Sequence, residues 1–96
     1  MPGYWIVKGK AVADAEALAA YNEIFINLMK RYRVKIIAGR DRVKTVEGEN
    51  FPRQFILRFE SYELAMQCYE DPEYQNSLTL ASRAYSREVS ILEGSD

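Results

Sequence analysis

The sequence contains no histidine, and Cys68 is the only cysteine among its 96 residues. The absence of histidine removes the commonest metal ligand, the usual haem ligand and the usual general base of Ser or Cys nucleophile triads. A single cysteine forms no disulfide within the chain and cannot build a thiolate zinc site. The five glycines are scattered and form no phosphate-binding loop. We therefore expect no metal site and no cofactor such as haem or flavin.

Long apolar runs and a strong net charge are also missing. No segment approaches the roughly 18 to 20 apolar residues that a helix needs to cross a bilayer. The first residues, MPGYWIVKGK, lack the features of a signal peptide. The 13 basic and 14 acidic residues give a net charge of -1, which offers no overall field to attract nucleic acid or an anionic membrane. We therefore expect a cytoplasmic protein with no nucleic acid and no membrane among its partners.

Positive charge is concentrated in one segment. Seven of the 13 basic residues lie within residues 30–44, and they are Lys30, Arg31, Arg33, Lys35, Arg40, Arg42 and Lys44. The first of them lie where a helix is expected to end, and cations near a helix C-terminus interact favourably with its dipole. The others fit a solvated hairpin, because no nucleic-acid-binding motif accompanies them. Binding of an anionic small molecule is the alternative interpretation.

The length and composition predict a single domain. With 48% apolar and 28% charged residues, the chain has the composition of an ordinary globular protein. A chain of this size is just long enough for one hydrophobic core. We assign the domain to residues 1–94 and treat residues 95–96 as a C-terminal tail.

The N-terminal part predicts a strand followed by a helix. β-branched and aromatic residues in YWIVKGKAV indicate a strand over residues 4–12. Asp14 is the expected helix N-cap, because its carboxylate can accept a hydrogen bond from an unpaired backbone N–H. Apolar residues then recur at steps of three and four as far as residue 32, namely Leu18, Tyr21, Phe25, Leu28 and Tyr32. This stripe should face the core.

The rest of the chain predicts three more strands and two helices. The segments 34–43 and 53–60 have strand character, and the polar stretch between them suggests an antiparallel hairpin. Ser61 can cap the next helix. Asp71 can cap another, because the proline that follows it suits the first helical position, where its missing N–H is not needed. A last strand is expected over residues 86–94.

The order βαββ(αα)β predicts an α+β fold of the ferredoxin-like βαββαβ type, a four-stranded antiparallel sheet with helices on one face. Along the third strand, Phe55, Leu57 and Phe59 share one side. The first strand is apolar on both sides, which is expected where both faces of a sheet are covered. Because the helices cover only one face, we predict that a second copy covers the other and that the protein is a homodimer.

Several segments together resemble a small bacterial family described as domain of unknown function 1330. They are GYWIV near the start, a GR pair ending the second strand, FESYELAMQCYEDPEYQ, the later Arg83 and the terminal LEG. The resemblance covers nearly the whole chain and is most specific from Phe59 through Gln75. The chain departs from the family pattern where a glycine pair is usual, because Arg40 follows Gly39 and is less free in its backbone conformation. The resemblance implies the dimeric α/β barrel superfamily, in which two ferredoxin-like sheets face each other, and it implies no activity.

The corner YEDPEYQ is the candidate binding site, because one helix ends there and another begins. The change of direction leaves a gap over the sheet that side chains or a ligand must fill. We predict a pocket with four ligand-binding residues, Arg58, Tyr69, Tyr74 and Arg83. The alternatives are that the tyrosines pack in the core and that Arg58 forms an ion pair with Glu60 or across a subunit interface.

Two kinds of function fit these features. The first is a homodimer that binds a small organic ligand, anionic or neutral, between its helices and its sheet. The second is a cofactor-free enzyme of isomerase, lyase or oxygenase type, in which Tyr or Arg groups would need strongly shifted pKa values. Binding ranks first, and no catalytic residue is assigned. Cys68 has no histidine and no nearby basic residue to activate it, so we interpret it as a small core hydrophobe.

Overall fold

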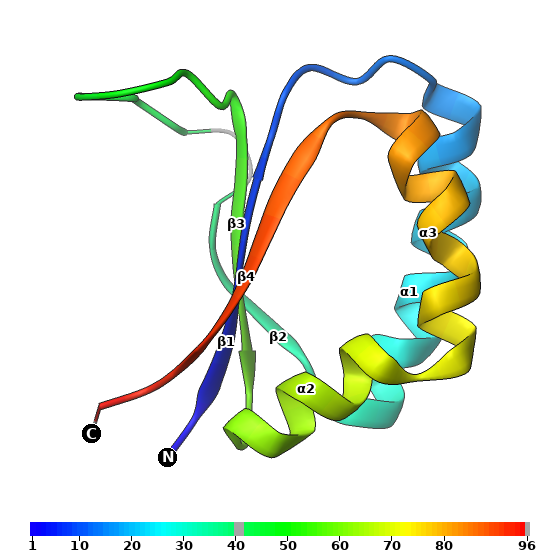
Figure 1. Ribbon diagram of the computed structural model, residues 1–96, viewed down its shortest axis with the longest axis vertical. Helices are drawn as coiled ribbons and strands as arrows, with labels where there is room; N and C mark the ends of the chain where they lie inside the picture. Colours follow the sequence, from blue (N-terminus) through cyan, green and yellow to red (C-terminus); the bar gives the residue numbers. More distant parts are fainter. Residues whose placement is uncertain (40–41, 96) are drawn as a thin grey trace.

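The computed structural model describes residues 1–39 and 42–95. These residues form four strands and three helices in the order β1 (Gly3–Gly9), α1 (Ala15–Tyr32), β2 (Lys35–Gly39), β3 (Arg53–Phe59), α2 (Tyr62–Glu70), α3 (Pro72–Ala84) and β4 (Arg87–Glu93). All three helices lie on one side of the sheet (Figure 1). The molecule therefore has two layers, with a helix-covered face and an open face of the sheet.

The strand order is β2-β3-β1-β4, and each neighbouring pair of strands is antiparallel. The connection from β1 through α1 to β2 skips one strand, and so does the connection from β3 through α2 and α3 to β4. Right-handed crossovers of this kind place their helices on the same face of the sheet. This is the ferredoxin-like α+β fold, so the predicted fold class and the predicted hairpin of the second and third strands are confirmed.

Each helix begins directly after the residue that the sequence predicts as its N-cap. The Asp14 carboxylate accepts a hydrogen bond from the backbone N–H of Ala17 at 3.0 Å, and the Ser61 hydroxyl accepts one from Leu64 at 3.1 Å. The Asp71 carboxylate accepts one from Glu73 at 2.8 Å. These bonds satisfy backbone donors that have no partner inside the helix, which is why short polar residues occupy these three positions.

All four expected strands are shorter in the structure, and the first two end three and four residues earlier than predicted. The strand predicted over residues 4–12 is β1, which ends at Gly9. One further bond, from the backbone N–H of Lys10 to the backbone oxygen of Ser86 at 2.9 Å, follows its last pair with β4. The strand predicted over 34–43 is β2, which ends at Gly39 with a φ of 115°. Only glycine adopts such a backbone conformation without strain. Arg40, and with it the departure from the family pattern, lies outside the described residues.

The core lies between the sheet and the helices and is centred on Trp5, which is 1% exposed. Its indole N–H donates to the backbone oxygen of Ala65 at 3.0 Å, which fixes α2 to β1. The rings of Phe59 and Tyr74 have their centroids 5.3 and 5.1 Å from that of Trp5. Cys68 is fully buried, and burial raises the pKa of its thiol to about 12, so its interpretation as a core hydrophobe is confirmed.

The two faces of the sheet differ in what covers them. In β3, Leu57 and Phe59 point towards the helices and are buried, whereas Ile56 and Arg58 alternate with them and lie on the open face. Ile56 is opposite Ile6 of β1 in the sheet. Within a single chain, the side chains on this open face are half-buried, as at Ile6 and Ile56, or exposed, as at Leu92.

Candidate functional site

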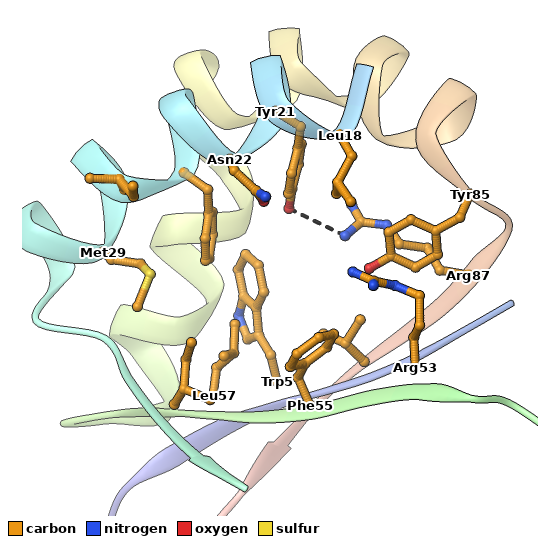
Figure 2. Close-up of a pocket in the computed structure, with 14 residues that line it drawn as sticks. Trp5, Leu18, Tyr21, Asn22, Met29, Arg53, Phe55, Leu57, Tyr85 and Arg87 are labelled. Atoms are coloured by element: carbon orange, nitrogen blue, oxygen red, sulfur yellow. Dashed lines mark hydrogen bonds between the residues drawn. The ribbon is translucent and has the colours of Figure 1, made fainter. Parts of the chain in front are cut away.

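An elongated cavity of about 320 Å³ lies between α1 and the sheet. Most of its wall is apolar or aromatic and includes Trp5, Val7, Phe25, Met29, Phe55 and Leu57. Figure 2 shows Met29 at one end of the cavity, and Tyr85, Arg53 and Arg87 together at the other. The cavity thus has an apolar body and one cationic end, which we call the arginine end.

The strand register brings the two arginines of this end together. Gly9 at the end of β1 is paired with Arg53 of β3 on one side and with Arg87 of β4 on the other. Because neighbouring strands lie about 4.8 Å apart, the two arginine backbones are separated by only about 10 Å. Each arginine is the first residue of its strand and has the same parity as that strand's core residues, so both side chains project towards the helices.

Gly9 leaves the space that Tyr85 occupies. A β-carbon at this position would overlap the Tyr85 ring, so only glycine allows the ring to lie against β1 at the arginine end. The Arg53 guanidinium carbon lies 4.7 Å from the centroid of the Tyr85 ring and 5.6 Å from that of Phe55. Cation–π contacts with two rings therefore hold the Arg53 side chain in place.

Arg87 belongs to a hydrogen-bond network with two tyrosines. Its guanidinium donates to the hydroxyl of Tyr21 at 3.2 Å and to that of Tyr74 at 2.9 Å, and the two hydroxyls are 3.1 Å apart. Burial raises the pKa of both tyrosines above the ordinary value. Both hydroxyls are therefore neutral at physiological pH, and they leave the positive charge of Arg87 uncompensated.

The arginine end has no acidic counterpart in the part of the chain that the structure describes. The residues that line the cavity include neither Asp nor Glu. The Nε atom of Arg53 is buried and has no hydrogen-bond partner among the described residues. A buried donor on a charged group is costly when it is left without an acceptor. The Arg53 guanidinium therefore keeps one donor that no described residue satisfies.

The four residues predicted as a site do not line one cavity. Tyr74 is fully buried and reaches the cavity only through the hydroxyl network with Tyr21 and Arg87. Tyr69 packs with its edge against Trp5, at a centroid distance of 5.8 Å, and its backbone oxygen accepts a hydrogen bond from Gln75. The two tyrosines also contact each other, with ring centroids 5.3 Å apart.

The two predicted arginines lie elsewhere. Arg58 is on the open face of the sheet, opposite Tyr4 of β1, because its parity is that of Ile56 and not that of the core residues of β3. The expected pairing with Glu60 is not found, because Glu60 is 3.6 Å from Arg33 instead. The exposed Arg83 lies 3.4 Å from the Asp14 carboxylate, at the start of α1.

The corner between α2 and α3 is organised by Asp71. Its carboxylate accepts hydrogen bonds from the Tyr32 hydroxyl at 2.7 Å and from Arg31 at 2.9 Å, in addition to the N-cap bond. The Tyr32 hydroxyl and the backbone N–H of Glu73 are the main causes that hold the pKa of this carboxyl below its ordinary value. The corner thus fixes the end of α1 to the start of α3, and its acidic residues pair with part of the basic segment.

Sequence reasoning missed Arg53 and Arg87, although a signal for both was present. Arg53 precedes Phe55 by two positions and Arg87 precedes Val89 by two, so strand alternation places each arginine on the buried side. The sequence alone did not predict that both arginines pair with Gly9, because this depends on two separate strand registers.

Within residues 1–39 and 42–95, no group of three or more His, Cys, Asp or Glu side chains could hold a metal ion. None of the helices in these ranges combines the length and the apolar character that crossing a bilayer requires.

Several solved structures are similar to the chain. A protein of unknown function from Rhodopseudomonas palustris superposes with a TM-score of 0.76, with 18% identity over 99% of this chain and 83% of that chain. A dimeric protein of unknown function with a ferredoxin-like fold from Bacteroides fragilis has a TM-score of 0.55, with 19% identity over 97% of this chain and 96% of that one. A dimeric ferredoxin-like protein of unknown function from Thermobifida fusca has a TM-score of 0.62, with 9% identity over 97% and 91% of the two chains.

These identities are low, so the likeness concerns the fold. No curated protein matches the chain. The family model described as "Domain of unknown function (DUF1330)" matches residues 2–95, and the chain therefore belongs to this family.

Proposed function

We propose that the protein is a homodimeric binding protein for a small organic molecule, which it holds in the cavity between α1 and the sheet. The observation that carries this proposal is the cavity itself, in which an apolar wall surrounds about 320 Å³ and the polar groups gather at one end. Ligand sites typically combine apolar walls with a few convergent polar groups. The volume is at the lower limit for such sites, which favours a small ligand.

A binding role fits the site better than catalysis. The raised pKa values of Tyr21 and Tyr74, caused mainly by burial, keep both hydroxyls protonated at neutral pH. A general base must be within reach of substrate and have a pKa near the working pH. The two hydroxyls are already bonded to each other and to Arg87. They are therefore suited to holding Arg87 in position, and not to accepting a proton.

The experiment that tests ligand binding uses Trp5, which is the only tryptophan and lines the cavity. Small molecules that copurify with the protein are extracted, identified by mass spectrometry and titrated back while Trp5 fluorescence is measured. We expect saturable binding, and we expect Leu18→Phe, which adds volume to the cavity wall, to abolish it. Val12→Phe, outside the cavity wall, is the matched control. A fluorescence response that Leu18→Phe leaves unchanged would rule out this cavity as the site.

The homodimer is proposed to form through the open face of the sheet. Tyr4, Ile6 and Ile56 give this face an apolar centre, and Leu92 on β4 is 51% exposed. The segment before β3 projects to the same side of the sheet in Figure 1, with Val46 81% exposed. Two of the similar structures are described as dimeric proteins with this fold. A second copy would cover these apolar side chains.

Sedimentation at micromolar concentration tests the dimer. We expect a species of twice the 11.1 kDa chain mass and an interface that buries on the order of 1,200 to 2,000 Å². Ile56→Lys should give a folded monomer, because it places a charge at the centre of the open face, whereas Val12→Lys should remain dimeric. A wild-type protein that sediments as a single chain would refute the dimer.

A further inference from the structure

The surface arginines and the cavity arginines differ in their partners. On the surface, Arg31 is 2.9 Å from the carboxylates of both Asp71 and Glu73, Arg33 is 3.6 Å from Glu60, and Arg83 is 3.4 Å from Asp14. Neither Arg53 nor Arg87 forms an ion pair within the described residues, although both are better shielded from water than these surface groups. A shielded guanidinium needs an anion more than an exposed one does.

The two cavity arginines have different local partners. Arg87 already donates to two hydroxyls, and these bonds fix its orientation. Arg53 is held by the rings of Tyr85 and Phe55, which accept no strong hydrogen bond, and its Nε atom has no partner. The guanidinium presents a planar set of donors that matches a carboxylate in a two-point contact. Arg53 is therefore the residue with donors available to a ligand, and Arg87 adds positive charge beside it.

We propose that Arg53, assisted by Arg87, binds the carboxylate of a small organic monoacid whose apolar body lies along Trp5, Phe25 and Met29. This inference rests on the proposed function of the cavity and specifies its ligand. The single charge follows from the lining, because its charged residues are Arg53 and Arg87 at one end. The rest of the wall is apolar apart from Asn22 and the tyrosine hydroxyls, and it offers no positive charge to compensate a second carboxylate. Flat rings in the wall, those of Trp5, Phe25 and Phe55, suit an aromatic or unsaturated body.

The role of Arg53 has a consequence for stability without ligand. Arg53→Met keeps most of the length of the side chain and removes a shielded charge that has no counter-ion among the described residues. Such charges are costly, so the ligand-free variant should unfold at a higher temperature than the wild type. Arg83→Met changes the same residue type at an exposed position outside both the cavity and the open face of the sheet, so it is the matched control.

The binding test compares acids with neutral molecules of the same shape. Benzoate, benzamide, hexanoate, hexanamide and inorganic phosphate are titrated separately into the protein, and the NMR signal of the Trp5 indole N–H is followed. We expect each carboxylate to bind at least tenfold more tightly than its amide. Arg53→Gln should reduce the affinity for the carboxylates to that for the amides, while Arg58→Gln should leave both unchanged.

The other outcomes would overturn the proposal in distinguishable ways. If acids and amides bind equally and Leu18→Phe abolishes both, the cavity binds ligands but does not select a carboxylate. If phosphate binds through Arg53 and the carboxylates do not, the site is for phosphate. If no probe binds and Arg53→Met lowers the unfolding temperature, Arg53 is structural, and the proposed function of the cavity fails with this inference.

Discussion

Arg53 and Arg58 are five positions apart on β3 and lie on opposite faces of the sheet. Arg53 points into the space between sheet and helices, where aromatic rings surround it and no carboxylate meets it among the described residues. Arg58 lies half-buried on the open face beside Tyr4 and Lys35. The comparison shows that strand parity, and not residue type, decides whether an arginine lies at the cavity or on the open face of the sheet.

The same division holds for the whole sheet. The helices of the same chain cover one face of the sheet, so the contribution of this face to stability should not depend on protein concentration. The open face is proposed to be closed by a second copy, so its contribution to stability should depend on concentration. Substitutions on the two faces therefore test the division directly.

The largest effect is expected from Phe59→Ala on the covered face. Phe59 is fully buried against Trp5, and loss of a buried phenylalanine typically costs about 3 to 5 kcal/mol of unfolding free energy. Chemical denaturation at two protein concentrations should show the same loss at both. Ile56→Ala, on the open face of the same strand, is expected to weaken the dimer more than the fold. If both variants lost stability equally at all concentrations, the division of the sheet into two faces would be wrong.

A smaller effect is expected from Tyr74→Phe. Removing this hydroxyl leaves Arg87 and Tyr21 each without one partner, and a buried group that loses its hydrogen bond typically costs about 1 to 3 kcal/mol. Tyr69→Phe is the control, because the structure gives its hydroxyl no hydrogen bond to a described residue. Thermal unfolding should separate the two variants, and equal loss in both would mean that the hydroxyl network contributes nothing.

The corner at Asp71 should respond to pH. The Tyr32 hydroxyl and the backbone N–H of Glu73 hold the pKa of Asp71 below its unfolded value. Its contribution to stability is therefore fully present above the unfolded pKa of about 3.9 and is lost as the pH falls through the lower folded value. Asp71→Asn should make the unfolding temperature fall less steeply between neutral and acidic pH. An unchanged slope would show that Asp71 is not linked to folding.

The smallest effect is expected from Arg83→Ala. Arg83 is exposed, and its ion pair with Asp14 at 3.4 Å lies in solvent, where such pairs contribute little. Its unfolding temperature and its ligand affinity should both equal those of the wild type. A loss of ligand affinity in this variant would restore Arg83 to the binding site and would require a different pocket from the one between α1 and the sheet.

Local chemistry explains why much of the fold was predictable. Asp14, Ser61 and Asp71 cap their helices as the sequence predicts, because a cap depends on atoms within three residues along the chain. The inward side of β3 was also predictable from the alternation of Phe55, Leu57 and Phe59. Strand ends were harder to predict, since β1 ends at its last pair with β4, Gly9 with Arg87, and these residues are 78 positions apart in the sequence.

The candidate site was only partly predictable. Tyr74 was selected from its place in the corner and does belong to the network beneath the cavity. Arg58 was selected as an arginine in a strand expected to be central, and Arg83 as a residue about two and a half helical turns after Tyr74. Both lie on other surfaces. Arg53 and Arg87 meet because each pairs with Gly9, and that encounter depends on two strand registers at once.

By itself, the sequence determined the order of the elements, their caps, the absence of histidine chemistry and the apolar character of both sides of the first strand. These features depend on the type of each residue and on the spacing of residues within a single helix or strand. Only the tertiary structure decided that Gly9 admits the Tyr85 ring. It also decided that two arginines with no acidic partner among residues 1–39 and 42–95 share one end of the cavity. The reason is physical: these side chains come from β1, β3, β4 and the end of α3, and only packing brings them together.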